Sequence, residues 1–328
     1  MTSADLTRYA RQLAVLDPAR QERLSRAALL VIGAGGLAAP VLQYLTGAGA
    51  GYIRVVDADA VSLSNLHRQT LFREADIGRP KVTVAAEALR ALNAEVEIEA
   101  AQTRFEPANA AALCEGMDLI LDCADSFAVS IMASDHCLAT GQPLISASVA
   151  GTAGYCGGFS GGKPGLRAVF PDLPQRLGAC DTDGVLGPSV GVLGSLQAQM
   201  ALAVLTGERA PLGRLVTFDA GALRFGGFRF DNAPNPAPNP AFIAPDSVTA
   251  ADFLIDLRAA GEPGPPLPAA KRRNVTDFDP GGPQPRPNQR AVFACRSGLR
   301  AWQAAERLAR RWDGEIKLLA LGDGGEAP

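Results

Sequence analysis

Histidine is scarce in this 328-residue chain, and long apolar runs and a surplus of one charge are missing altogether. The two histidines, His67 and His136, are not placed as catalytic bases. A membrane-spanning helix needs about 18 or more consecutive apolar residues. The longest candidate, residues 190–205, is interrupted by glycine, serine and glutamine. We therefore expect that segment to be a buried helix, and we expect no membrane partner.

Closely spaced cysteine pairs are also missing. The six cysteines are scattered along the chain, at Cys114, Cys123, Cys137, Cys156, Cys180 and Cys295. The opening residues, MTSADLTRYARQ, contain no apolar signal core, so we expect reduced thiols and a cytoplasmic location. Acidic and basic residues are mixed and the formal net charge is −3, which argues against a nucleic-acid-binding surface.

What the chain does contain, near its start, is a strand, a glycine turn, a helix and a second strand. The apolar run 29–32 is typical of a strand buried on both faces. Three glycines follow it: Gly33, Gly35 and Gly36. A helical apolar pattern comes next, and the apolar strand 52–56 then ends in Asp57, an acid placed to bind ribose hydroxyls. The pattern predicts an α/β fold of the Rossmann-like, doubly wound type, with a mostly parallel sheet and helices on both faces.

Nicotinamide- and flavin-binding proteins share that pattern, so the residues after Asp57 decide between the classes. Asp59 comes first, and an Asn-x-x-Arg-Gln run from Asn65 to Gln69 follows. A dehydrogenase has no evident use for such a run, whereas a protein that binds a triphosphate can neutralise phosphate charge with Arg68. An NAD-binding oxidoreductase and a non-catalytic scaffold that docks partners through its C-terminal part stay open as alternatives.

Several segments together resemble the HesA/MoeB/ThiF family, the bacterial relatives of the ubiquitin-activating enzymes. They are RYARQ at 8–12, GAGGLAAP at 33–40, DADAVSLSNLHRQTLF at 57–72, GRPKV at 78–82 and DCADSF at 122–127. The similarity extends from about Arg8 to about Phe230. It implies that the chain uses ATP and Mg²⁺ to adenylate the C-terminal glycine of a ubiquitin-like sulfur carrier that ends in diglycine, with release of pyrophosphate.

The resemblance also assigns roles to individual residues. The nucleotide contacts fall on Gly33, Gly35, Gly36, Asp57, Asp59, Asn65, Arg68 and Lys81. The resemblance assigns magnesium binding to Asp125. It also implies that Arg11 reaches the phosphates from the other subunit of a homodimer. Lys81 lies near a predicted helix N-terminus, an unfavourable place for a cation unless an anion binds there. The simpler alternatives are a surface role for Lys81, a helix cap for Asp125 and a solvated helix face for Arg11.

Cys180 precedes the segment GVLGPSVGVLGSLQA, as a cysteine does in the thiamine branch of the family, where it takes part in sulfur transfer. The resemblance implies that Cys180 accepts the activated acyl group or a persulfide. A loop cysteine without a role is the alternative.

The family commonly carries two CxxC pairs that hold a structural zinc, and both are absent from this sequence. The corresponding positions are residues 165–168 and 235–240, where no cysteine occurs. A tetrahedral thiolate site needs those ligands. We therefore predict that the chain binds no zinc and that packing or a dimer interface stabilises this region.

A Pro/Asn-rich linker at residues 231–244 separates the first predicted domain, residues 1–230, from a small α/β domain at residues 245–328. Two apolar strands are predicted in the small domain, at 253–258 and 291–294. The second is followed by the loop CRSGLR and an apolar-periodic helix. This arrangement resembles the rhodanese active-site loop.

In such a loop the backbone amides, the helix N-terminus and Arg296 or Arg300 would stabilise a thiolate or persulfide at Cys295. The resemblance is partial, because the Pro-rich segment GEPGPPLPAAKRRN replaces the usual histidine-containing one. Two alternatives stay open: an active sulfurtransferase domain, loaded by a persulfide donor such as a cysteine desulfurase, and a vestigial domain that docks partners. The carrier also stays open, since the molybdopterin and thiamine types fit equally well.

Overall fold

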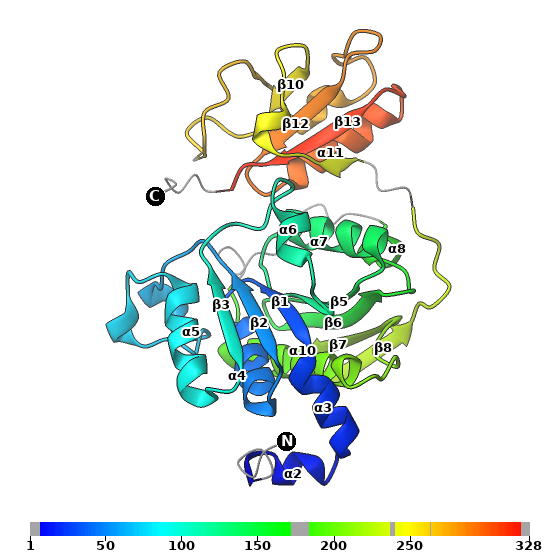
Figure 1. Cartoon of the computed structure of the whole chain (residues 1–328). Helices are drawn as coiled ribbons and strands as arrows, with labels where there is room; N and C mark the ends of the chain where they lie inside the picture. The colour runs from blue at the N-terminus through cyan, green and yellow to red at the C-terminus, as the bar shows by residue number, and fades with distance from the viewer. Residues whose placement is uncertain (1–6, 172–183, 237–239, 263, 323–328) are drawn as a thin grey trace.

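Two β-sheets organise the chain in the computed structural model, which describes residues 7–171, 184–236, 240–262 and 264–322 (Figure 1). The larger sheet has eight strands in the order β3-β2-β1-β4-β5-β6-β7-β8. Along the chain its elements are α2 (Ala10–Leu13), α3 (Pro18–Arg26), β1 (Ala28–Ile32), α4 (Ala38–Ala48), β2 (Tyr52–Val56), η1 (Leu63–Asn65), η2 (Glu74–Asp76), α5 (Lys81–Leu92), β3 (Glu97–Ala101), α6 (Ala110–Cys114), β4 (Leu119–Asp122), α7 (Phe127–Thr140), β5 (Pro143–Ala150), β6 (Ala153–Ser160), α8 (Leu166–Val169), α10 (Gly187–Leu205), β7 (Arg214–Asp219) and β8 (Arg224–Arg229).

The smaller sheet has five strands, all parallel, in the order β11-β10-β12-β13-β9. Its elements are β9 (Ala241–Phe242), η3 (Pro245–Ser247), β10 (Phe253–Asp256), β11 (Lys271–Arg272), η4 (Val275–Phe278), β12 (Ala291–Cys295), α11 (Leu299–Ala309) and β13 (Ile316–Ala320). Residues 241–242 fall in the linker predicted from sequence, yet they pair with β13. The smaller sheet therefore begins four residues before the predicted domain does.

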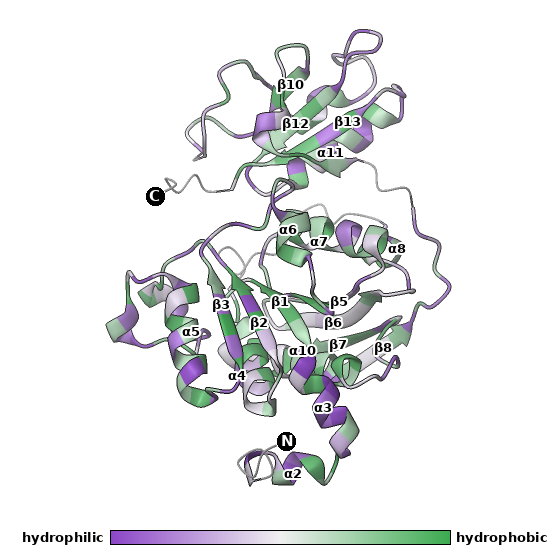
Figure 2. Ribbon diagram, viewed as in Figure 1, coloured by the Kyte–Doolittle hydropathy of each residue, from purple (hydrophilic) through white to green (hydrophobic). Residues whose placement is uncertain are grey.

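The five strands β3, β2, β1, β4 and β5 are parallel and have a hydrophobic core on each face. In β1, Leu29 and Val31 belong to the core that α4, α5 and α10 cover. Leu30 and Ile32 point the other way, into the core that α6 and α7 cover. Figure 2 shows the central strand β1 in the green of hydrophobic residues, whereas the surface helix α3 is largely purple. The predicted doubly wound sheet with helices on both faces is confirmed.

The rest of the large sheet is antiparallel and differs in part from expectation. Residues 150–171 contain one eight-residue strand, β6, and the short helix α8. β6 pairs along its whole length with β5, which extends to Ala150. The edge strand β8 was not predicted, because its sequence RFGGFR is exposed throughout and has no apolar run.

Helix α10 is buried, as predicted for residues 190–205. It is the one described helix long and apolar enough to cross a membrane, but 56% of that apolar window is buried inside the protein. Leu193 and Ala201 are fully enclosed by the core. Gln197, also buried, donates hydrogen bonds to the carbonyl oxygens of Asp122 (2.8 Å) and Ile145 (3.1 Å). α10 is therefore a core helix that ties β4 to β5.

Candidate active site

The loop between β1 and α4 is held tightly at its first glycine. Gly33 has a φ of +94°, and a Cβ atom there would lie 2.9 Å from the carbonyl oxygen of Cys123. Its amide donates to the carbonyl oxygen of Val56, at 2.8 Å. Only glycine combines this conformation with this approach. The loop thus lies directly beside the end of β4, where the chain continues to Asp125.

Asp57, at the end of β2, fixes the same loop. One carboxylate oxygen accepts from the amide of Ala34 at 2.7 Å, and the other accepts from the amide of Asp59 at 2.7 Å. Burial raises the pKa of Asp57, while the positive charge of Lys81 and the two amides oppose that rise. Each oxygen keeps a second lone pair, so a ribose hydroxyl can still bind. The sequence did not reveal that Asp57 also shapes the glycine loop.

Arg68 and Asn65 form a cluster against Gly36. The Arg68 guanidinium donates to Asn65 Oδ1 (2.9 Å), contacts His67 Nε2 (2.8 Å) and donates to the Ser64 carbonyl (3.3 Å). A Cβ atom at Gly36 would lie 3.2 Å from the Arg68 carbonyl oxygen. The structure thus brings the Asn-x-x-Arg-Gln run onto the glycine loop, as its role in one site requires.

Gln69 is a residue of this site to which the sequence assigned no role. Its side chain is buried, and its Oε1 atom has no hydrogen-bond partner among the described residues. Its Nε2 atom would lie 3.6 Å from a Cβ atom at Gly35. A buried acceptor without a partner costs about 1–3 kcal/mol, so a bound group that donates to Gln69 would be stabilised. The sequence feature that could have indicated a role for Gln69 is its position at the end of the Asn-x-x-Arg-Gln run.

Lys81 and Asp59, each predicted to contact nucleotide, are paired with one another. Lys81 Nζ donates to Asp59 Oδ2 at 2.9 Å, and the Lys81 amide donates to the Asp59 carbonyl at 2.9 Å. The lysine side chain is 6% exposed, whereas that of Asp59 is 67% exposed. The amine is therefore held in place at the start of α5 by a carboxylate that can return to water.

The last residue of β4, Asp122, and the loop residue Asp125 are two acids in opposite environments. Asp125 is exposed, whereas Asp122 is completely buried. Asp122 accepts from the Ser146 hydroxyl at 2.7 Å and from the Ala124 amide at 3.2 Å. Burial nevertheless raises the pKa of Asp122 to about 6. Of the two, Asp125 is available to a ligand, and Asp122 supports the loop that carries it.

The raised pKa of Asp122 predicts a specific dependence of stability on pH. The native carboxyl binds its proton more tightly than the unfolded one, so the unfolded chain deprotonates first between about pH 4 and pH 6. Stability therefore falls as pH rises through that window, by roughly 3 kcal/mol for this group. Asp122→Asn should lack that loss. Urea unfolding of both proteins at pH 4 and pH 7 measures it, and equal pH dependence would contradict the assignment.

Arg11 lies near the C-terminal ends of α4 and α5, away from the candidate site. Next to it, Gln12 Nε2 donates to the carbonyl oxygen of Ala48, at the end of α4, at 2.9 Å. Tyr9 accepts from Asn93, at the end of α5, also at 2.9 Å. Both helices begin at the candidate site, and α4 alone spans about 16 Å. The site of its own chain is therefore beyond the reach of the Arg11 side chain.

Of the two cysteines predicted to carry sulfur, the structure describes only Cys295. Cys180 lies outside the described residues. Cys295 is fully buried, and its sulfur accepts from the amides of Gly298 (3.2 Å) and Ala301 (3.4 Å). Burial raises the pKa of Cys295, although those amides and Arg300 favour the thiolate. The loop thus has the predicted anion-binding amides, but its thiol is enclosed.

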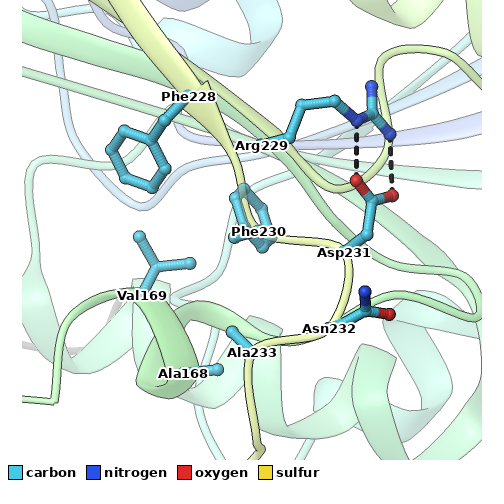
Figure 3. A pocket seen from close by; sticks show the side chains of 8 residues that line it. All are labelled: Ala168, Val169, Phe228, Arg229, Phe230, Asp231, Asn232 and Ala233. Atoms are coloured by element: carbon cyan, nitrogen blue, oxygen red, sulfur yellow. Dashed lines mark hydrogen bonds and ion pairs between the residues drawn. The ribbon is translucent and has the colours of Figure 1, made fainter.

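The region where the family would hold zinc is joined by hydrogen bonds instead. The Gly165 amide donates to Asn235 Oδ1 at 2.9 Å, and Arg167 donates to the Pro240 carbonyl at 3.1 Å. Beside them, apolar side chains and the Arg229–Asp231 ion pair line an open pocket of about 550 Å³ (Figure 3). Metal analysis of the purified chain should find no stoichiometric zinc; one tightly bound zinc per chain would contradict this.

The residues of the site fit a nucleoside triphosphate with magnesium. The cationic Arg68 belongs to the segment packed on Gly36, and at Gly35 the only described atom within 4 Å of the position of a Cβ atom, chain neighbours aside, is Gln69 Nε2, a donor. Among the described residues, no three histidine, cysteine or acidic side chains are grouped to hold a metal by themselves. Mg²⁺ commonly binds through one or two carboxylates plus substrate phosphates. A single exposed carboxylate at Asp125 is compatible with that mode.

Comparison with known proteins supports the same interpretation. Residues 9–239 match the ThiF family. A sulfur carrier protein adenylyltransferase of Thermus thermophilus is 40% identical over 230 residues, which cover 67% of this chain and 85% of that protein. The adenylyltransferase and sulfurtransferase MOCS3 of Bos taurus is 42% identical over 226 residues, which cover 67% of this chain but only 50% of MOCS3. Escherichia coli MccB, crystallised with MccA-N7isoASN, superposes with a TM-score of 0.63 at 20% identity, covering 70% of this chain and 74% of MccB, and shares the fold.

Proposed function

The chain belongs to the ThiF family, and from that premise we propose that it is an adenylyltransferase acting on the C-terminal glycine of a ubiquitin-like sulfur carrier. The substrate class is the one named for its relative in Thermus thermophilus. The observation that carries the proposal is the packing of the Arg68 segment against the glycine loop, which brings an oriented cation to the part of the fold where phosphates would bind.

The reaction needs no general base. The carrier's terminal carboxylate is already ionised at neutral pH. One of its oxygens attacks the α-phosphorus of ATP, the bond from that phosphorus to the bridging oxygen breaks, and pyrophosphate leaves with the electron pair. The product is a carrier acyl-adenylate, a mixed anhydride. Catalysis then rests on positioning and on neutralising charge at the phosphates.

Each residue has a place in that scheme. Asp57 binds the ribose while it holds the glycine loop, and Arg68 and Asn65 bind phosphate oxygens. Lys81 exchanges Asp59 for a phosphate oxygen. Mg²⁺ held by Asp125 would neutralise charge on the leaving pyrophosphate. Arg11 acts on the site of the second subunit of a homodimer, since the site of its own chain is out of reach.

ATP–pyrophosphate exchange with purified carriers tests the function. Exchange that requires both Mg²⁺ and a carrier ending in diglycine is expected, and a carrier without its last glycine should support none. Stabilisation by a nicotinamide dinucleotide but not by Mg-ATP would instead favour an oxidoreductase. Binding of a carrier without any exchange would favour a scaffold. The same assay, run with molybdopterin-type and thiamine-type carriers, identifies the pathway; we place the enzyme in the cytoplasm.

Sulfur transfer through Cys295 is the further step of the proposal, with Cys180 as a second candidate thiol. A persulfide on Cys295 would attack the acyl-adenylate and release AMP. After treatment with a cysteine desulfurase and cysteine, cyanide should release thiocyanate from the wild-type chain, and the Cys295→Ser variant should release less. Equal thiocyanate from both proteins would leave the C-terminal domain as a docking module.

A further inference from the structure

Trp302 joins the two parts of the molecule. It lies on α11 of the C-terminal domain and is 7% exposed. Its ring meets Phe127, the first residue of α7, edge to face, with centroids 5.5 Å apart and planes at 75°. The guanidinium of Arg167, on α8, lies over the same ring at 4.2 Å. One aromatic side chain of the C-terminal domain thus contacts two elements of the N-terminal domain; Figure 1 shows α11 beside α7 and α8.

Hydrogen bonds within the N-terminal domain and to the linker hold the Arg167 side chain in the orientation in which it contacts Trp302. Its Nε and Nη2 atoms donate to the two carboxylate oxygens of Asp135 at 2.8 and 2.7 Å. Nη2 also donates to the carbonyl oxygen of Pro240, directly before β9. This fork arrangement presents the flat guanidinium face to the indole, a geometry that lysine does not reproduce. Arg167 therefore serves both the linker and the domain contact.

The cysteine loop lies at the same contact. A Cβ atom at Gly298 would lie 3.2 Å from the Ala128 side chain and 2.7 Å from the Phe242 ring. Ala128 and Ile131 of α7 belong to the same hydrophobic cluster as Cys295. A fourth contact, from Arg104 to the Leu321 carbonyl oxygen at 3.4 Å, joins the end of β13 to the N-terminal domain. The loop that holds Cys295 is therefore covered by α7 where the domains meet.

We propose that the contact of Trp302 with Phe127 and Arg167 is a releasable joint that keeps the Cys295 loop closed against α7. The thiol becomes reactive only when the C-terminal domain lifts from α7. The proposal does not depend on adenylation, because the exposure of a thiol needs neither nucleotide nor carrier. It accounts for a sulfur that has a full set of anion-binding amides and yet has no access to solvent.

Alkylation of Cys295 in the full-length protein tests the joint. Iodoacetamide labelling, followed by mass spectrometry of the peptide that contains Cys295, separates this thiol from the other five cysteines. The double variant Phe127→Ala/Arg167→Ala should be labelled about ten-fold faster or more, because opening becomes easier. Ala128→Leu, a wedge against Gly298, should accelerate labelling without loss of either joint residue. Arg307→Ala, which removes an ion pair to Asp279 within the C-terminal domain, should leave the rate unchanged.

Hydrogen exchange of the β12 amides distinguishes opening of the joint from unfolding of the domain. Faster labelling with β12 still protected supports the joint. Unchanged labelling in both the double and the wedge variants would overturn the proposal. Faster labelling together with lost β12 protection would also overturn it, since the thiol would then be exposed by unfolding. Trp302 emission in a Trp312→Phe background should shift to longer wavelength in the wedge variant, which keeps both Phe127 and Arg167, only if the joint opens.

Discussion

Arg68→Ala is expected to reduce carrier-dependent ATP–pyrophosphate exchange by about 10³-fold. Asn65 and the Ser64 carbonyl hold the guanidinium, and the Arg68 backbone carbonyl packs against Gly36, so the side chain is already oriented before phosphates bind. Such pre-oriented charge stabilises the transition state most, because little reorganisation is needed during the reaction. The initial rate of exchange with saturating carrier and Mg-ATP measures the effect.

Arg79→Ala is the matched control for that variant. Arg79 lies eleven positions further along the same segment and pairs with Asp76 and Glu87, away from the glycine loop. Its loss should change exchange little and should not lower the thermal unfolding temperature more than Arg68→Ala does. Normal exchange by the Arg68 variant, with a normal fold, would remove Arg68 from the active site.

Asp125→Ala should cause a comparable loss, about 10³-fold in exchange, through magnesium rather than through direct charge neutralisation. Asp125 is exposed at the end of β4, so its removal leaves no buried partner behind and the fold should be unaffected. Asp125→Glu should recover part of the activity, with a higher Mg²⁺ concentration needed for half-maximal exchange. A titration of exchange against Mg²⁺ for the three proteins measures this.

Asp118→Asn provides the control from the same strand. Asp118 directly precedes β4 and accepts from the Ala28 amide at 2.9 Å, a bond that the asparagine oxygen can keep. That variant should retain both the exchange rate and the Mg²⁺ dependence of the wild type. A wild-type Mg²⁺ titration for Asp125→Ala would remove Asp125 from the metal site; the simpler alternative, a helix cap, does not match the structure, in which Ser126 is the N-cap of α7.

The sequence was most informative where strands are buried on both faces. β1, β2 and β4 appear as short apolar runs, and each ends at a residue of the candidate site or just before one. β8 gave no such signal, because an exposed edge strand needs no apolar residues. The same holds for β3, whose sequence EIEAA is only partly buried. Prediction therefore succeeded in the centre of the sheet and failed at its two edges.

The candidate site was predicted as a set of residues but not as a set of contacts. The spacing of Asn65 and Arg68 drew attention to one segment, and the structure places that segment on the glycine loop. The Lys81–Asp59 ion pair and the double role of Asp57 depend on tertiary distances that no local pattern contains. The individual ligand roles stay predictions until the variants are measured.

The pairing of Asp59 with Lys81 has a consequence for which anions the candidate site would accept. The Lys81 ammonium group already forms an ion pair with the Asp59 carboxylate, so a small monoanion such as chloride gains little by displacing that carboxylate. A polyphosphate that brings several charges competes far better, and Asp59 regains full hydration when it is displaced because most of its side chain already faces water. We therefore expect weak anions to leave the Lys81–Asp59 ion pair intact and a nucleoside triphosphate to displace Asp59 from Lys81.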